Sequence, residues 1–261
     1  MSPESPSCKS DAKTWLGGCF LSHLDRGAIL ERIRQWIVRG SKGHYACAIN
    51  VSKLVASQRD SKLRAFLANS SVNIADGAPI LAATRWVGNP IPERVTGVEL
   101  MEDLLQLADQ QGYSVYFFGS KQQILDKVVA RCVEEFPGAV VAGARNGYFS
   151  AEEESAIVSE IAAANADILL IALGVPQKEY FLDDHNNDLN VSLSLPVGGA
   201  FDVYAGEKKR APGWVQRFGV EWLWRSAYDL SRARMVLKSA FPFIGIVLRE
   251  IFSQRLTGKK K

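Results

Sequence analysis

The sequence of 261 residues lacks the motifs that mark several common enzyme classes. It contains no GxGxxG, Walker A, HExxH or GxSxG motif. These absences argue against a dinucleotide-binding domain of the usual type, a P-loop NTPase, a zinc protease and an α/β-hydrolase. Only three histidines are present, and there is no Asp-x-Asp pair, the carboxylate pattern that holds a metal on a nucleotide diphosphate. We therefore expect neither a metal nor a cofactor in this protein.

Cysteine is scarce and long hydrophobic runs are missing. The four cysteines form no CxxC pair, which favours a reducing compartment over a disulfide framework or a zinc site. Cys132 falls on the apolar side of a predicted helix and is expected in the core. Residues 1–10 are polar, unlike a secretory signal. The longest apolar stretch, Val236–Leu248, contains Lys238 and Pro242 and is too short to span a bilayer.

The composition that remains is that of a soluble globular protein, with 47% hydrophobic and 23% charged residues. Its charge is unevenly distributed. From Glu207 to Lys261 there are thirteen Lys/Arg against four Asp/Glu, so this segment carries a charge of +9. Because the whole chain carries +3, residues 1–206 carry −6. A basic tail on a mildly acidic body indicates an anionic partner for the tail.

Short apolar runs alternate with amphipathic helical patterns along the body of the chain. This alternation predicts an α/β fold of Rossmann-like type, with a mostly parallel sheet and helices on both faces. The predicted strands are His44–Asn50, Val72–Ala75, Ser114–Phe118, Ala139–Val141, Ile168–Leu173 and Val191–Val197. The predicted helices are Arg26–Arg39, Val98–Gln111, Lys121–Phe136, Ala151–Asn165 and Gln177–Asp188, with a further one through Ile80–Trp86.

Ligands of such sheets bind beyond the carboxyl ends of the strands, and most of the loops there contain glycine. Gly119 and Ser120 precede a predicted helix, where their N–H groups could bind a phosphate. Asp76 follows a strand and precedes Gly77, so it is either a general base or the N-cap of the next helix.

Two further loops carry polar side chains. Arg94 can hold a diphosphate through its guanidinium, or it can be a solvated surface residue. Thr96 could instead cap the helix beginning near Val98, with Glu99 in its first turn. Gln177 and Lys178 could contact a sugar, or they could simply begin a helix after Pro176.

The composition changes after Gly206. We predict an α/β core over residues 1–206 and a C-terminal helical appendage over 207–261 that is basic and partly apolar. Tryptophans, arginines and an apolar stripe are what interfacial helices use at anionic membranes. The aromatic residues alternate with that stripe and form no exposed stacking platform, which argues against nucleic-acid binding. A solvated charge run and tryptophans packed on the core remain the alternative.

The ordered set of motifs resembles the WecG/TagA/CpsF family of glycosyltransferases. The segments that carry the resemblance span roughly Ala46 to Arg234: Ile49-Asn50, Asn73–Gly77, Glu93–Gly97, Phe117–Gly119, Leu173–Pro176, Gly198–Asp202, Lys209–Pro212 and Glu221–Arg225. Single motifs are weakly specific, whereas the ordered set, above all the last two, is specific.

The resemblance implies an inverting, metal-independent transferase. It would move a sugar from a UDP-sugar to an undecaprenyl-diphosphate-linked saccharide in the synthesis of cell-surface polysaccharide. The family's aspartate base carries over to Asp76. Its binding residues carry over to Asn50 and Arg94, and its appendage arginines to Arg225 and Arg232, with Arg210 in the basic motif before them. Arginines that neutralise the leaving diphosphate agree with the missing Asp-x-Asp pair.

This sequence departs from the family pattern at three places. A threonine frequent in the family is Ala48 here. The family glutamine of Pro-x-Gln-Glu is Lys178, with Gln177 one residue earlier, and one residue on a helix is about 100° of rotation. The arginine expected three residues after Arg232 is Met235.

Two functional hypotheses follow. The first is the transferase, peripheral on the cytoplasmic face of the plasma membrane, whose apolar tail could otherwise be buried between the subunits of a homo-oligomer. The second is a UDP-sugar-binding protein of the same fold without transferase activity. For the transferase, we expect removal of the residues after Gly206 to increase solubility and to cut activity.

Overall fold

The computed structural model describes residues 12–208 and 230–256, with the side chains of the last helix described from 238 to 253. Six strands form one parallel sheet in the order β4-β3-β8-β7-β5-β6. These strands are β3 (His44–Ile49), β4 (Val72–Ala75), β5 (Ser114–Gly119), β6 (Val140–Arg145), β7 (Ile168–Ala172) and β8 (Leu193–Pro196). The predicted α/β class with a parallel sheet is confirmed, and every predicted strand is present within a few residues at each end.

Helices cover both faces of the sheet because alternate strand residues point to opposite sides. In β5, Tyr116 and Phe118 belong to one buried cluster and Val115 and Phe117 to the other. Residues of α1 (Arg26–Val38), α5 (Gly97–Gln111), α6 (Gln122–Glu135) and α9 (Ala200–Tyr204) complete one cluster. Residues of α2 (Val51–Ser57), α3 (Ser61–Asn69), α4 (Ala78–Trp86), α7 (Glu154–Ala164) and α8 (Gln177–His185) complete the other. Cys132 is fully buried, as predicted.

Several elements were not predicted from the sequence. Strands β1 (Lys13–Leu16) and β2 (Cys19–Ser22) form an antiparallel hairpin around Gly17 and Gly18. Helices α2 and α3 fill the connection between β3 and β4, each starting at a side-chain N-cap, Asn50 and Asp60. A 3-10 turn, η1 (Ala151–Glu153), precedes α7, so the predicted helix 151–165 begins irregularly.

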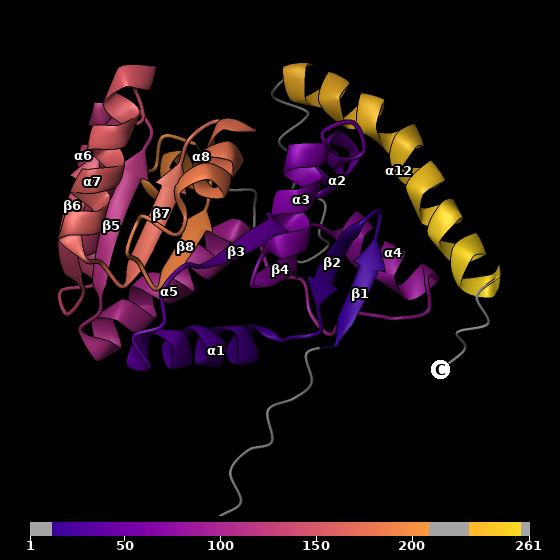
Figure 1. Ribbon diagram of the computed structural model, residues 1–261, viewed down its shortest axis with the longest axis horizontal. Helices are drawn as coiled ribbons and strands as arrows, with labels where there is room; N and C mark the ends of the chain where they lie inside the picture. The colour runs from indigo at the N-terminus through magenta and orange to yellow at the C-terminus, as the bar shows by residue number, and fades with distance from the viewer. Residues whose placement is uncertain (1–11, 209–229, 257–261) are drawn as a thin grey trace, which may run out of the picture.

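The C-terminal helix α12 (Leu230–Leu256) packs against α2, with smaller contacts to α4 and β1. Figure 1 shows α12 in yellow along the side of the molecule that carries the hairpin, far from β5 and β6. Phe243 and Val247 of α12 join the buried cluster that contains Leu16 and Leu54. No helix within residues 12–208 and 230–256 is long and apolar enough to cross a membrane.

Candidate functional site

Parallel pairing brings the candidate residues to a single edge of the sheet. Ile49 pairs with Ala75 at the ends of β3 and β4, and Gly119 pairs with Ala172 at the ends of β5 and β7. Asn50, Asp76, Ser120 and Gln177 each follow within a few residues of one of these strand ends. The carboxyl edge of the sheet therefore collects the groups that the sequence placed in separate loops.

Asp76 leaves the end of β4 without capping the next helix. Its backbone N–H donates to the Ile49 carbonyl at 2.9 Å, which continues the pairing of β3 and β4 by one residue. Gly77 is the N-cap of α4, and no side chain caps that helix. Gly77 has φ 109°, a conformation that glycine adopts far more readily than other residues. The N-cap of α4 is therefore Gly77 and not the half-buried Asp76, so the N-cap alternative for Asp76 is wrong.

Asn50 is held rigidly at the same edge by the start of α2. Its side-chain oxygen accepts from the Lys53 N–H at 2.9 Å, which makes Asn50 the N-cap of α2. This bond fixes the direction of the side chain, and the Asn50 amide nitrogen has no protein partner among the described residues. Asn50 can therefore cap a helix and still offer its amide N–H groups to a ligand.

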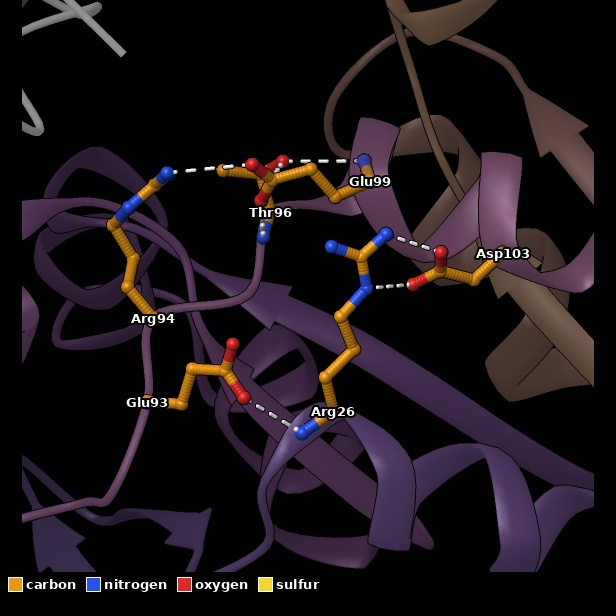
Figure 2. A network of polar contacts seen from close by, with 6 residues as sticks. All are labelled: Arg26, Glu93, Arg94, Thr96, Glu99 and Asp103. Carbon is orange, nitrogen blue, oxygen red and sulfur yellow. Dashed lines mark hydrogen bonds and ion pairs between the residues drawn. The ribbon is translucent and has the colours of Figure 1, made fainter. Parts of the chain in front are cut away.

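Thr96 forms a capping box with Glu99 at the start of α5 (Figure 2). The Thr96 hydroxyl donates to Glu99 Oε2 at 2.8 Å and accepts from the Glu99 N–H at 3.2 Å. Both functions of the hydroxyl are therefore used by the helix. The capping interpretation of Thr96 is confirmed, and its hydroxyl is better assigned to holding the loop than to a substrate.

Arg94 approaches the same Glu99 from the loop before α5, and the two form an ion pair at 3.4 Å (Figure 2). Both side chains are only about 20% exposed, at 19% and 20%. Glu99 therefore holds both the helix cap and the guanidinium. Arg94 is a directed, partly buried cation rather than a solvated surface residue.

The loop that carries Arg94 is anchored on α1 by a second set of contacts (Figure 2). The Arg26 N–H donates to Glu93 Oε2 at 2.9 Å, and the Arg26 guanidinium donates to both oxygens of the buried Asp103. This paired geometry is the strong form of an arginine–carboxylate contact. It fixes the loop between the N-terminus of α1 and the side of α5.

The expected phosphate contact of the Ser120 N–H is not available in this structure. That N–H donates to the Ala172 carbonyl at 2.9 Å, because the pairing of β5 with β7 continues past the strand end. Gly119, with φ 121°, lies so close to Ala172 that a Cβ would be 2.5 Å from the Ala172 carbonyl carbon. Gly119 therefore serves close packing of two strands. Ser120 still lines the cavity described next.

A cavity of about 660 Å³ opens beyond the ends of β5, β6 and β7. Gln177 and Ser120 line it, together with Tyr148, whose side chain is 67% exposed. The remaining lining residues are Gly147, Phe149, Ser150, Glu153, Ala172, Leu173 and Gly174. The cavity combines an aromatic ring, hydroxyl and amide groups, and one carboxylate, which suits a polar ligand with a flat ring.

Lys178 does not share this cavity with Gln177. The two residues begin α8 one position apart, so their side chains leave the helix about 100° apart. Gln177 is exposed, whereas Lys178 is 3% exposed and forms an ion pair with Glu179. In this structure the Lys178 ammonium is turned away from solvent, and the sugar contact of Lys178 stays a prediction.

Sequence reasoning missed the second cation that pairs with Glu179. Lys53 of α2 also forms an ion pair with Glu179, and its side chain is 7% exposed. A lysine at an inward position of a short, unpredicted helix gave no signal by itself. The buried carboxylate at position 179 would have required such a cation, but only the fold identifies which one.

The structure does not describe the side chains of the three candidate arginines of the appendage. Arg210 and Arg225 lie outside the described residues, and of Arg232 only the backbone, within α12, is described. Within the described part of the chain, no three His, Cys, Asp or Glu side chains are grouped to hold a metal ion.

Comparison with known proteins identifies the family of this chain. The model of the glycosyl transferase WecG/TagA/CpsF family matches residues 14–257. The chain is 29% identical over 218 residues to the N-acetylglucosaminyldiphosphoundecaprenol N-acetyl-beta-D-mannosaminyltransferase of Bacillus spizizenii, covering 84% of this chain and 80% of that one. It is 27% identical over 206 residues to the protein of the same name from Bacillus subtilis, covering 79% and 76%. The chain therefore belongs to the WecG/TagA/CpsF family of glycosyltransferases.

Proposed function

We propose that this chain transfers a hexose from a UDP-sugar to an undecaprenyl-diphosphate-linked saccharide, with inversion and without a metal ion. The observation that carries the proposal is the position of Asp76, a half-buried residue directly after β4 at the carboxyl edge of the sheet, where Gly77 is the N-cap of α4. Asp76 accepts the proton of the acceptor hydroxyl. The hydroxyl oxygen bonds to the anomeric carbon while the bond to the UDP oxygen breaks.

The cavity at β5, β6 and β7 supports a nucleotide donor. Tyr148 offers a ring on which a uracil base stacks, and Gln177 and Ser120 offer hydrogen bonds. In the sheet order β4-β3-β8-β7, the third strand from β4 is β7, which is about 14 Å away at the usual strand spacing. An extended nucleotide diphosphate sugar bridges such a span, with its base in the cavity and its sugar toward Asp76.

Arginines supply the positive charge that the leaving diphosphate requires. Arg94 is fixed near the carboxyl edge of the sheet by Glu99. The family resemblance adds Arg210, Arg225 and Arg232 of the appendage. A site built this way works without a divalent cation, so we expect turnover to continue in the presence of a chelator.

The names of the relatives suggest the acceptor and a first donor. Both are called mannosaminyltransferases acting on N-acetylglucosaminyl-diphosphoundecaprenol. We therefore propose that lipid as the acceptor to test, with UDP-N-acetylmannosamine as the first donor.

Helix α12 supports binding to the cytoplasmic face of the membrane that contains this lipid. Its outer side carries Phe241, Ile244, Leu248 and Phe252, all exposed and spaced by three or four residues. Beside this stripe, Arg59 and Arg249 flank a groove of about 240 Å³ between α2 and α12. An apolar stripe beside cationic groups matches an anionic bilayer surface.

A UDP-sugar-binding role without transfer is the second candidate. It is favoured by two positions that depart from the family pattern. Ala48 is buried against Gly97 and offers no hydroxyl, and Lys178 is turned inward. Binding of UDP without turnover on any lipid-linked acceptor would support this candidate over the first.

The test of the proposed function is the Asp76→Asn variant of the full chain. We expect kcat to fall about 10²- to 10⁴-fold, the usual contribution of a general base. UDP affinity by calorimetry and the thermal unfolding midpoint should both stay near the wild-type values. Turnover would be followed with vesicles that contain the acceptor lipid, with and without EDTA.

The matched control is Asp126→Asn, which removes an exposed carboxylate on α6. It should retain wild-type turnover. Near-normal activity of Asp76→Asn would exclude Asp76 as the base.

A further inference from the structure

The groove between α2 and α12 contains two arginines that the protein itself does not use. Its lining residues are Val55, Gln58 and Arg59 on the α2 side and Pro242, Gly245, Ile246 and Arg249 on the α12 side. Arg59 and Arg249 are both exposed. Neither guanidinium forms a hydrogen bond or an ion pair with any residue that the structure describes. Two cations that are available to a ligand therefore line one small groove.

The acidic residues next to these arginines do not neutralise them. Asp60 directly follows Arg59, but it is the N-cap of α3 and its other oxygen accepts from the Tyr180 hydroxyl at 2.5 Å. Glu250 directly follows Arg249 and is half-buried. Neighbouring residues on a helix point about 100° apart, so Glu250 lies on another side of α12. The groove therefore keeps its positive charge.

The carbonyl groups at the end of α2 are also covered. A helix C-terminus carries partial negative charge, which would repel an anion. Here the Arg64 guanidinium donates to the Ser57 carbonyl and to the Gln58 carbonyl, each at 3.0 Å. The Gln58 side chain donates in turn to the Gly17 carbonyl at 2.7 Å. Arg64 is thus committed to the main chain, whereas Arg59 is available to an anion.

The α12 side of the groove is built from residues that leave space. Proline and glycine are the residue types that weaken a helix most, and Pro242 and Gly245 both line the groove. A Cβ on Gly245 would meet no atom within 4 Å, so packing does not require glycine there, and a large side chain would extend into the groove. This side of α12 lies about 100° around the helix axis from the exposed stripe of Phe241, Ile244, Leu248 and Phe252.

We propose that this groove binds the phosphate of an anionic phospholipid headgroup, held between the guanidinium groups of Arg59 and Arg249. The inference rests on the proposed membrane binding of α12 and gives that binding a specific ligand. When the stripe lies among the acyl chains, a groove on the adjacent side of the helix is at the depth of the headgroups. Guanidinium groups bind phosphate oxygens through paired N–H donors. One phosphate would thus link α2 of the core to α12.

The groove is one short helix away from the candidate active site. Helix α2 has seven residues and begins at its N-cap, Asn50, so it spans about 10 Å. A headgroup bound at the far end of α2 would hold the carboxyl edge of the sheet close to the bilayer surface. The diphosphate of a lipid-linked acceptor lies at the same surface. We therefore expect loss of this site to raise the KM for the lipid acceptor with little change in kcat.

The first test measures binding of the full chain to vesicles of phosphatidylcholine and phosphatidylglycerol that contain no acceptor lipid. The variants are Arg59→Gln, Arg249→Gln and the two combined. Each single variant should lower the partition coefficient about tenfold or more, the usual range for a lost hydrogen bond to a charged group. The combined variant should lose little more, because residues that bind one group are strongly coupled. Independent, additive losses would indicate a diffuse attraction to the bilayer and would overturn the inference.

The matched control removes two positive charges elsewhere, with Arg39→Gln and Lys42→Gln combined. Arg39 is the C-cap of α1, and Lys42 donates to Asn165 at the end of α7. Helices α7 and α12 lie on opposite sides of the molecule (Figure 1). This control should bind vesicles nearly as well as the wild type. An equal loss in the control would show that net charge alone governs binding and would refute the site.

Gly245→Leu tests the groove without changing any charge. The leucine side chain should fill the groove, and it favours the helix more than glycine does, so the unfolding midpoint should not fall. The readout is the Nε–H signals of Arg59 and Arg249 during titration with soluble dihexanoyl-phosphatidylglycerol, assigned by their absence from the two single variants. We expect these signals to shift in the wild type and not in Gly245→Leu. No shift in the wild type, or equal shifts in both chains, would overturn the inference.

Two other occupants of the groove give different results, and either result would overturn the inference. If the groove binds the diphosphate of the acceptor, the arginine variants will bind acceptor-free vesicles normally and lose binding only when the acceptor lipid is present. If the groove binds a second copy of the chain, the arginine variants will lose a dimer in analytical ultracentrifugation and bind vesicles normally.

The vesicle assay also separates this inference from the proposed reaction, because it needs neither donor nor acceptor. Coupled losses in the two arginine variants, in a chain that shows no turnover, would support the site and count against the proposed reaction. Turnover that depends on Asp76, with vesicle binding independent of Arg59 and Arg249, would support the proposed reaction and refute the site.

Discussion

Lys178 is a buried cation whose surroundings disfavour its charge. Burial, together with the neighbouring charge of Lys53, lowers its pKa from 10.5 to about 8, although Glu179 opposes this change. Below pH 8 the folded protein therefore holds a buried ammonium, which an unfolded chain would expose to water. Between pH 8 and 10.5 the folded form has lost this proton and the unfolded form still has it, so the free energy of unfolding rises with pH in this window.

Replacing Lys178 by methionine should remove this pH dependence. The pKa change, which already includes the attraction to Glu179, corresponds to about 3 kcal/mol. We expect Lys178→Met to be more stable than the wild type by about 1–3 kcal/mol at pH 7, with the difference shrinking up to pH 10.5. Urea unfolding of both chains across this range measures it, and a constant difference would show that Lys178 does not titrate as described.

At the scale of elements, α12 has two apolar sides that do different things. Phe243 is 6% exposed and packs into the cluster with α2 and β1, whereas Phe241, two residues earlier, is 83% exposed. Residues two apart on a helix point in widely different directions. The same helix therefore stabilises the fold with one side and presents hydrophobic surface to the outside with the other.

Paired alanine substitutions separate these two sides. Phe243→Ala should lower the free energy of unfolding by about 3 kcal/mol, because it opens a cavity in a packed cluster. Phe241→Ala should change stability by less than about 0.5 kcal/mol but weaken binding to anionic vesicles several-fold. Chemical unfolding and vesicle sedimentation provide the two readouts, and vesicle binding that is unaffected by Phe241→Ala would argue against the membrane-facing side.

The elements also show which local patterns are informative. Strands such as β7 are continuous apolar runs, because both faces of a parallel sheet are buried. The edge strand β6 is partly exposed and was predicted only as Ala139–Val141, since its later residues include Arg145. The hairpin around Gly17 and Gly18 carried a recognisable signal, two glycines between short strands. Without the fold, that signal was not distinguished from an ordinary loop.

For the whole molecule, the packing of α12 changes what truncation should do. Deleting the residues after Gly206 removes Phe243 and Val247 from the buried cluster and uncovers Leu16 and Leu54. We therefore expect the truncated chain to lose activity on the lipid-linked acceptor and to bind a hydrophobic dye more strongly. The gain in solubility expected from the sequence should not appear. Truncation removes the exposed apolar side of α12, but it also exposes the apolar surface of the core on which α12 packs.

Replacing Phe241, Ile244, Leu248 and Phe252 by serine is the matched comparison. This variant removes only the exposed stripe, so its solubility should rise while its unfolding midpoint stays close to that of the wild type. A truncated chain with full activity would show that the appendage is not needed for transfer.

The sequence alone determined the α/β class, the parallel strands, the family and the loops that hold Asn50, Asp76 and Arg94. These features depend on apolar periodicity and on short motifs, which are local along the chain. Only the tertiary structure decided that Gly77 rather than Asp76 is the N-cap of α4 and that Thr96 caps α5. It also decided that the Ser120 N–H donates to the Ala172 carbonyl. Only the structure shows that the Lys178 side chain points inward and that Lys178 and Lys53 both pair with Glu179. Such pairings join residues far apart in the chain, and a buried charge selects its partner by position in space rather than by distance in sequence.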